Sequence, residues 1–192
     1  PKTYLITARL YQKEASTLKS PRLDIKIAQE RNGIFKFIED LLKNCHRVGF
    51  EETSLTFSEY KNIKKLTTAK LLPFRDLIET ERAIKTADEI KKIEKAQIIS
   101  QKAFSQITKI LKVGQTEKEI AETLTKIIKR LGGQGLSFES IIASGPNSGL
   151  PHYLTGNRRL TINDILLLDF GAKYQNYCAD LSRTVFIGKA KS

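Results

Sequence analysis

Two aspartates in this chain have the spacing that paired-carboxylate chemistry requires. Asp169 directly follows the apolar run Ile165–Leu168, and Asp180 lies eleven residues further on. A carboxylate within an apolar strand loses hydration and needs a partner. The intervening residues, 171–176, contain the Gly, Gln and Asn typical of a hairpin turn. The two aspartates are therefore the first candidates for a functional site.

The expected hairpin brings these carboxylates face to face. Paired residues of an antiparallel hairpin have a constant sum, and a turn centred between Tyr174 and Gln175 makes Asp169 and Asp180 direct partners. Their Cβ atoms would lie about 4.5–5.5 Å apart. A shared proton, a basic side chain or a cation would relieve the repulsion, and a divalent metal suits carboxylate ligands. Taken singly, Asp169 could simply end a strand, and Asp180 could pair with Arg183.

His152 is the third candidate, at the end of the turn-rich stretch 144–151. Histidine is the usual proton donor and acceptor near neutral pH, and loops held by a scaffold often carry function. The alternative is an exposed loop residue without a chemical role, because no Ser, Cys or Asp nearby completes a triad. The other histidine, His46, is interpreted as a surface residue.

The elements that must position these residues form two groups. In the first 86 residues, short apolar strands at 4–6, 23–27, 48–50 and 69–72 alternate with helical patterns, which predicts a small α/β domain. Thr86–Glu89 and Thr116–Glu119 are capping boxes, each predicting the start of a long amphipathic helix. We expect the first helix to end at Gly114. Its buried face is expected to contain Ile90, Ile93, Ala96, Ala103, Ile107 and Ile110. Strands are expected at 138–143, 165–169 and 177–187, and the domains at 1–86 and 87–192.

Composition narrows the class of protein. The 192 residues are 40% hydrophobic and 28% charged, which excludes a disordered chain, a collagen and a disulfide-rich miniprotein. The net charge of +12 divides into +6 on each side of residue 86, which favours solvated helix faces over a nucleic-acid footprint. No apolar run approaches a membrane span. Two cysteines indicate free thiols in a reducing compartment, the cytoplasm. We expect no nucleic-acid or membrane partner, and a homo-oligomer is compatible with the sequence.

The motifs resemble those of the pita-bread metallopeptidases, and within them the Xaa-Pro aminopeptidases and Xaa-Pro dipeptidases. The matching pieces are the segments 143–152, 168–172 and 178–184, which include His152, Asp169 and Asp180. The segments 4–9, 48–51 and 82–90 extend the resemblance over nearly the whole chain. It implies an α/β N-terminal domain of the creatinase/prolidase type, truncated at its start, followed by the first half of an α+β pita-bread catalytic domain.

The resemblance also implies a reaction. Two divalent metal ions, manganese first with cobalt or zinc as alternatives, would share Asp169 and Asp180, and His152 would hydrogen-bond the substrate or the tetrahedral intermediate. The substrate would be a peptide with proline in second position. The first hypothesis for the function is an Xaa-Pro aminopeptidase, the second is an Xaa-Pro dipeptidase, and the third is a non-catalytic binding module. The family completes its site with one His and two Glu that do not follow here, so we expect a fragment that is inactive alone.

Overall fold

The computed structural model describes residues 2–18, 20–29 and 33–188 of the chain. By its internal contacts the chain divides into two compact units, Pro1–Ala83 and Ile84–Ser192. The division falls three residues before the boundary expected from the Thr86 capping box. A bilayer-spanning helix, which needs about 20 apolar residues, is not found within the described ranges.

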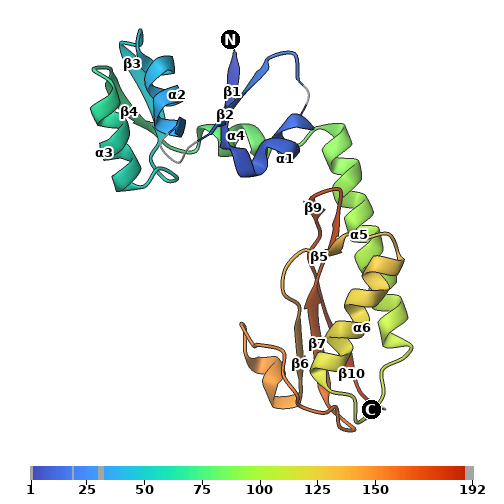
Figure 1. Cartoon of the computed structure of the whole chain (residues 1–192). Coiled ribbons are helices and arrows are strands. Elements are labelled where there is room, and N and C mark those ends of the chain that lie inside the picture. Colours follow the sequence, from blue (N-terminus) through green and yellow to red (C-terminus); the bar gives the residue numbers. More distant parts are fainter. Residues whose placement is uncertain (1, 19, 30–32, 189–192) are drawn as a thin grey trace. The chain divides into compact units, whose positions relative to one another are not determined.

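Parallel strand pairs form the framework of the N-terminal unit (Figure 1). β1 (Thr3–Ala8) pairs with β2 (Leu23–Ala28), and β3 (Arg47–Glu51) pairs with β4 (Lys70–Phe74). All four expected strands of this unit are therefore present. Parallel neighbours need a crossover connection, which helical segments supply here. The helices of the unit are η1 (Arg9–Tyr11), α1 (Gln12–Ser16), α2 (Gly33–Leu42), α3 (Phe57–Leu66) and α4 (Leu77–Ala83).

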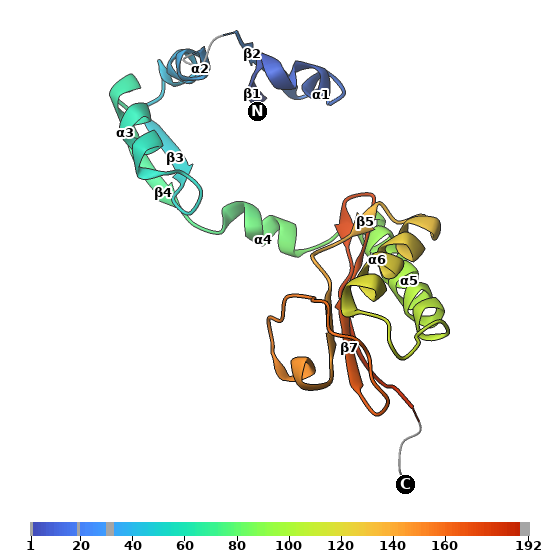
Figure 2. The same cartoon turned by 60° about the horizontal axis from the view of Figure 1, so that its bottom comes forward.

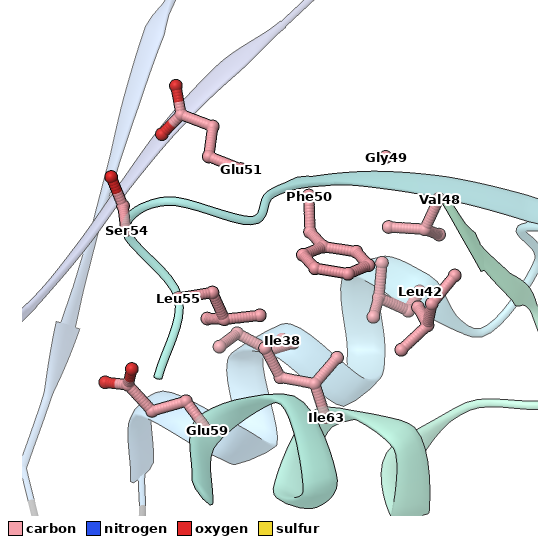
Figure 3. A pocket seen from close by; sticks show the side chains of 11 residues that line it. Ile38, Leu42, Val48, Gly49, Phe50, Glu51, Ser54, Leu55, Glu59 and Ile63 are labelled. Atoms are coloured by element: carbon pink, nitrogen blue, oxygen red, sulfur yellow. The ribbon is translucent and has the colours of Figure 1, made fainter. Parts of the chain in front are cut away.

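A cavity of about 360 Å³ lies among α2, β3 and α3 in this unit. Figure 3 shows Ile38, Phe50 and Ile63 directed toward one another across it, while the carboxylates of Glu51 and Glu59 lie at its margin. The ring of Phe50 also lies 5.3 Å, centroid to centroid, from that of Tyr60. Such apolar side chains are what a core requires, so we interpret the cavity as loosely packed core between two helices and a sheet.

The C-terminal unit packs two long helices against antiparallel sheet. α5 (Ala87–Thr108) and α6 (Glu117–Arg130) each begin with a complete capping box, as predicted. They run along one side of the strands (Figures 1 and 2). One sheet has the order β10-β7-β6 and the other β5-β8-β9. The strands are β5 (Gly135–Leu136), β6 (Ile141–Ser144), β7 (Ile165–Phe170), β8 (Ala172–Tyr174), β9 (Tyr177–Cys178) and β10 (Leu181–Phe186).

Strand β7 alternates between the core and the open face of its sheet. Leu166, Leu168 and Phe170 are fully buried, whereas Asp169 is half-buried. Successive side chains of a strand point to opposite faces, so the carboxylate of Asp169 lies on the face opposite the core. The core around these residues comes from the facing sides of both helices, and includes Ile99, Ala103, Ile107, Ile120, Leu124 and Ile128.

Helix α5 differs from its expected extent. It ends at Thr108 instead of Gly114, and the expected burial of Ile90 and Ile110 is wrong, since they are 46% and 43% exposed. Ile110 lies beyond the end of the helix. Ile90 lies six residues before the buried Ala96, which at 3.6 residues per turn is about 120° around the helix. Its apolar side chain is therefore on a different face from the core.

Ser100 joins α5 to the strand that follows the candidate aspartate. Its fully buried Oγ donates to the Ala96 carbonyl at 3.0 Å and accepts from the Ala172 N–H at 2.9 Å. Ser100→Ala is expected to cost about 1–3 kcal/mol, because it leaves a buried N–H without an acceptor. Urea unfolding followed through hydrogen exchange of the β7 amides would measure the loss.

A matched control for this variant is Thr125→Val on α6. The Thr125 hydroxyl donates only to Ala121 of its own helix in the described structure, at 2.9 Å. Its removal leaves no N–H without an acceptor and is expected to change stability by less than about 0.5 kcal/mol. Equal losses in the two variants would contradict the inferred role of Ser100.

Candidate metal and catalytic site

The hairpin that carries both aspartates turns one residue later than expected. Gln175 and Asn176 have φ values of 46° and 66°, the positive pair that defines a two-residue type I′ turn. The turn centre therefore lies between these two residues. Asp169 consequently pairs with Ser182, and the predicted direct pairing of Asp169 with Asp180 is wrong. The physical reason is that Asn readily accepts the positive φ that the primed turn demands.

The shifted register nevertheless keeps both carboxylates on one face. Asp180 falls opposite Gly171, between the Ala179–Ala172 hydrogen bond and the Leu181–Phe170 pair. Moving the turn centre by one residue moves the partner of Asp169 by two residues, from Asp180 to Ser182. A shift of two residues keeps each side chain on the same face of the sheet. Asp169 and Asp180 are thus diagonal neighbours, for which Cβ atoms are about 7–8 Å apart or somewhat less. Asp169 is half-buried and Asp180 is exposed.

Gly171 allows the two strands to approach between the aspartates. A Cβ at this position would overlap the Ala179 carbonyl oxygen and the Ser137 hydroxyl. Ser137 bridges the same gap: its N–H donates to the Gly171 carbonyl at 2.9 Å, and its Oγ donates to the Ala179 carbonyl at 2.7 Å. The expected single strand 177–187 is interrupted here, and it appears as β9 and β10 with 179–180 between them.

The immediate partner of Asp169 is a hydroxyl group. Ser182 Oγ donates to Asp169 Oδ1 at 2.7 Å. Arg183, the alternative partner for Asp180, instead donates to the Ser182 carbonyl at 2.8 Å. Within the described ranges, no three His, Cys, Asp or Glu side chains are grouped so as to hold a metal ion. The two carboxylates are hard oxygen donors that suit a divalent cation, and they fit part of its usual ligand shell.

His152 lies in an exposed turn after η2 (Gly145–Gly149). The orange segment that includes η2 runs beside β6 (Figure 1). His152 lines a depression of about 170 Å³ together with Ile141 of β6. Ile141 pairs in register with Asp169 of β7. The turn that carries His152 thus lies near β6, which pairs with the strand of Asp169, and the role of His152 in catalysis stays a prediction.

Glu117 is a buried acidic residue that the sequence analysis missed. Its side chain is fully buried at the start of α6, and it accepts five hydrogen bonds from the segments around His152. The capping-box motif drew attention to Glu119, which does bond the Thr116 N–H at 2.8 Å. Nothing in the sequence distinguishes Glu117 from a solvated glutamate of a first helical turn. Only the tertiary approach of distant loops buries it.

Hydrogen bonds favour the charged form of the two buried carboxyls near this loop, Glu117 and Asp164. Burial acts to raise the pKa of the Glu117 carboxyl, but hydrogen bonds from Asn147, Ser144 and Tyr153 outweigh burial and hold the pKa below its usual value. Arg158 donates to both oxygens of the buried Asp164, and this bond lowers the pKa of Asp164.

The chain matches two known sequence families, one for each part. The pattern of the Creatinase/Prolidase N-terminal domain matches residues 1–84, and that of metallopeptidase family M24 matches residues 91–192. The Xaa-Pro dipeptidase of Pyrococcus furiosus is 33% identical over 183 residues, which are 91% of this chain and 52% of the relative.

Solved structures agree with this similarity. An Xaa-Pro dipeptidase from Bacillus anthracis superposes with a TM-score of 0.84 at 32% identity, over 97% of this chain and 52% of the other. An X-Pro aminopeptidase from Thermotoga maritima gives 0.83 at 31% identity, over 98% and 53%. The chain therefore spans about half the length of these relatives, and its fold is part of a pita-bread fold behind a creatinase-type N-terminal domain. The chain belongs to metallopeptidase family M24.

Proposed function

We propose that the protein to which this chain belongs is a metal-dependent peptidase that cleaves the bond before a proline in second position. The observation that supports the proposal is that Asp169 of β7 and Asp180, in the segment between β9 and β10, lie close together along one hairpin in a chain of family M24. Carboxylate oxygens are the ligands that hard divalent cations prefer. Manganese is the proposed metal, with cobalt or zinc as alternatives.

Each residue of the proposed site has a separate task. Asp169 and Asp180 would hold the metal, and Ser182 orients the Asp169 carboxylate through its 2.7 Å hydrogen bond. A divalent ion bound there would polarise the scissile carbonyl as a Lewis acid and lower the pKa of water for the attack. His152 is exposed and so can reach a bound peptide, to which its imidazole would donate a hydrogen bond.

The length of the peptide substrate distinguishes two candidate functions, Xaa-Pro dipeptidase and Xaa-Pro aminopeptidase. The sequence motifs put an Xaa-Pro aminopeptidase first. The relatives named as Xaa-Pro dipeptidases shift the weight toward a dipeptidase, whereas the Thermotoga maritima similarity keeps the aminopeptidase as the second candidate. Hydrolysis of an Ala-Pro dipeptide and of an Ala-Pro-Ala tripeptide by the product of the complete reading frame, with Mn²⁺ added, would separate the two. Cleavage of neither peptide would overturn the proposal.

Removal of one proposed ligand provides the direct test. Asp180→Asn in the same product is expected to weaken Mn²⁺ binding at least tenfold, since even outer-shell changes cost about 10–100-fold in metal affinity. Titration calorimetry with Mn²⁺ measures this without reference to activity. The control is Asp88→Asn, which removes an equal charge at the exposed Asp88, the partner of Lys92 on α5. Unchanged Mn²⁺ affinity in Asp180→Asn would remove Asp180 from the site.

A further inference from the structure

The loop that carries His152 is built on one buried carboxylate. Glu117 Oε1 accepts from the Ser144 N–H at 2.8 Å, the Ser144 hydroxyl at 2.7 Å and the Asn147 amide at 3.0 Å. Glu117 Oε2 accepts from the Tyr153 hydroxyl at 2.7 Å and the Gly156 N–H at 3.2 Å. Buried charges persist only when they are well paired or hydrogen-bonded, and five donors meet that condition.

These bonds fasten the turn around His152 at both ends. Asn147 precedes the turn, and its carbonyl accepts the Leu150 N–H at 3.1 Å. Tyr153 follows His152, and its N–H donates to the Leu150 carbonyl at 3.3 Å. The Asn147 amide also donates to the Tyr153 hydroxyl at 2.9 Å, which closes a ring of contacts over Glu117. His152 itself is exposed, so its position depends on the anchors on either side.

We propose that Glu117 is the positioning residue of His152, acting through Tyr153 and Asn147. The catalytic meaning of that role rests on the proposed function, whereas the positioning itself does not. Glu117 lies 35 positions before His152 in the sequence, on the first turn of α6, so the helix core fixes the carboxylate. A rigid support of this kind is what a proton-donating side chain on a loop requires.

Removal of the Tyr153 hydroxyl tests the proposal with little risk to folding. In Tyr153→Phe the residue at 153 keeps its aromatic ring but loses its hydrogen bonds to Glu117 and Asn147. The backbone order parameters of 150–153 are expected to fall from about 0.85 toward 0.6 or below, measured by ¹⁵N relaxation on the 192-residue chain. The His152 ring resonances should shift or broaden, while His46, the other histidine, provides an internal reference in the N-terminal unit.

Tyr177→Phe is the matched control. The Tyr177 hydroxyl donates to Glu89 at 3.0 Å, so this variant also removes a tyrosine bond to a glutamate in the first turn of a helix, but away from the loop. It should leave 150–153 and His152 unchanged. Unaltered order of 150–153 in folded Tyr153→Phe would overturn the proposal, and so would an equal response in Tyr177→Phe.

Glu117→Gln gives a second, stronger perturbation. A glutamine amide has one oxygen in place of two, so in either orientation its NH₂ faces N–H or hydroxyl donors, and loss of order is expected throughout 144–156.

In the product of the complete reading frame, Tyr153→Phe should lower kcat about tenfold with KM little changed, a part of the 10²–10⁴ that positioned proton-transfer groups contribute. If the unaltered product cleaves no Xaa-Pro peptide, the proposed function fails while the relaxation test of positioning still stands.

Discussion

Gly171→Ala is expected to destabilise the C-terminal unit by at least about 3 kcal/mol, the upper end of the range for overpacking. The added Cβ would overlap the Ala179 carbonyl oxygen, and backbone cannot rotate aside as a side chain can. The segment 179–180, which carries Asp180, must then move away from the end of β7, which also separates the two carboxylates. Urea unfolding followed through hydrogen exchange of the β7 and β10 amides would measure the loss.

Gly149→Ala distinguishes this clash from the general effect of losing a glycine. A Cβ at Gly149 meets no atom within 4 Å, and the φ of Gly149 lies outside the left-handed region. That variant should be neutral or gain about 0.4–1 kcal/mol through the less flexible unfolded chain. Wild-type stability in Gly171→Ala would mean that the two strands are not in close approach at this point.

The hairpin shows how far local sequence determines structure here. Alternating apolar residues and the flanking turn residues were enough to predict both strands and their antiparallel pairing. The register depends on which two of Tyr174, Gln175 and Asn176 occupy the central positions of the turn. The two possible turns differ in free energy by little more than the cost of a positive φ at one residue. Because alternation has a period of two, the error left Asp169 and Asp180 on a common face and changed only their separation.

The hydrogen bonds to Glu117 that hold the His152 loop could not be predicted from the sequence, because they are tertiary contacts. Glu117 and Glu119 occupy the same capping-box segment, and both are typical of a first helical turn. The difference between them arises because the β6–η2 segment crosses the helix start and delivers the donors of Ser144 and Asn147. Sequence periodicity describes contacts within an element, whereas these contacts join segments 27 and 30 residues apart.

Arg158→Met is expected to destabilise the C-terminal unit by about 2–4 kcal/mol at pH 7, somewhat below the usual range for breaking a buried pair because Arg158 is 26% exposed. Arg158 Nη1 lies 2.6 Å from Asp164 Oδ2, and it also donates to Ser144 Oγ at 2.7 Å. Methionine keeps much of the side-chain volume, so the loss reports the unpaired carboxylate. Arg159→Met is the control, since the side chain of the exposed Arg159 hydrogen-bonds only the Gly114 carbonyl among the described residues.

The dependence of this loss on pH identifies its cause. In the wild type, Arg158 holds the pKa of Asp164 below its usual value, so the pair stabilises the fold above the unfolded pKa of about 3.9, and that stability is lost as pH falls through the folded pKa. In Arg158→Met the main cause of the lowered pKa is gone, and protonation of buried Asp164 becomes easier. The difference in unfolding free energy between wild type and variant should therefore narrow from pH 7 to pH 3. A difference that stays constant over that range would show that Arg158 acts through packing and not through its charge on Asp164.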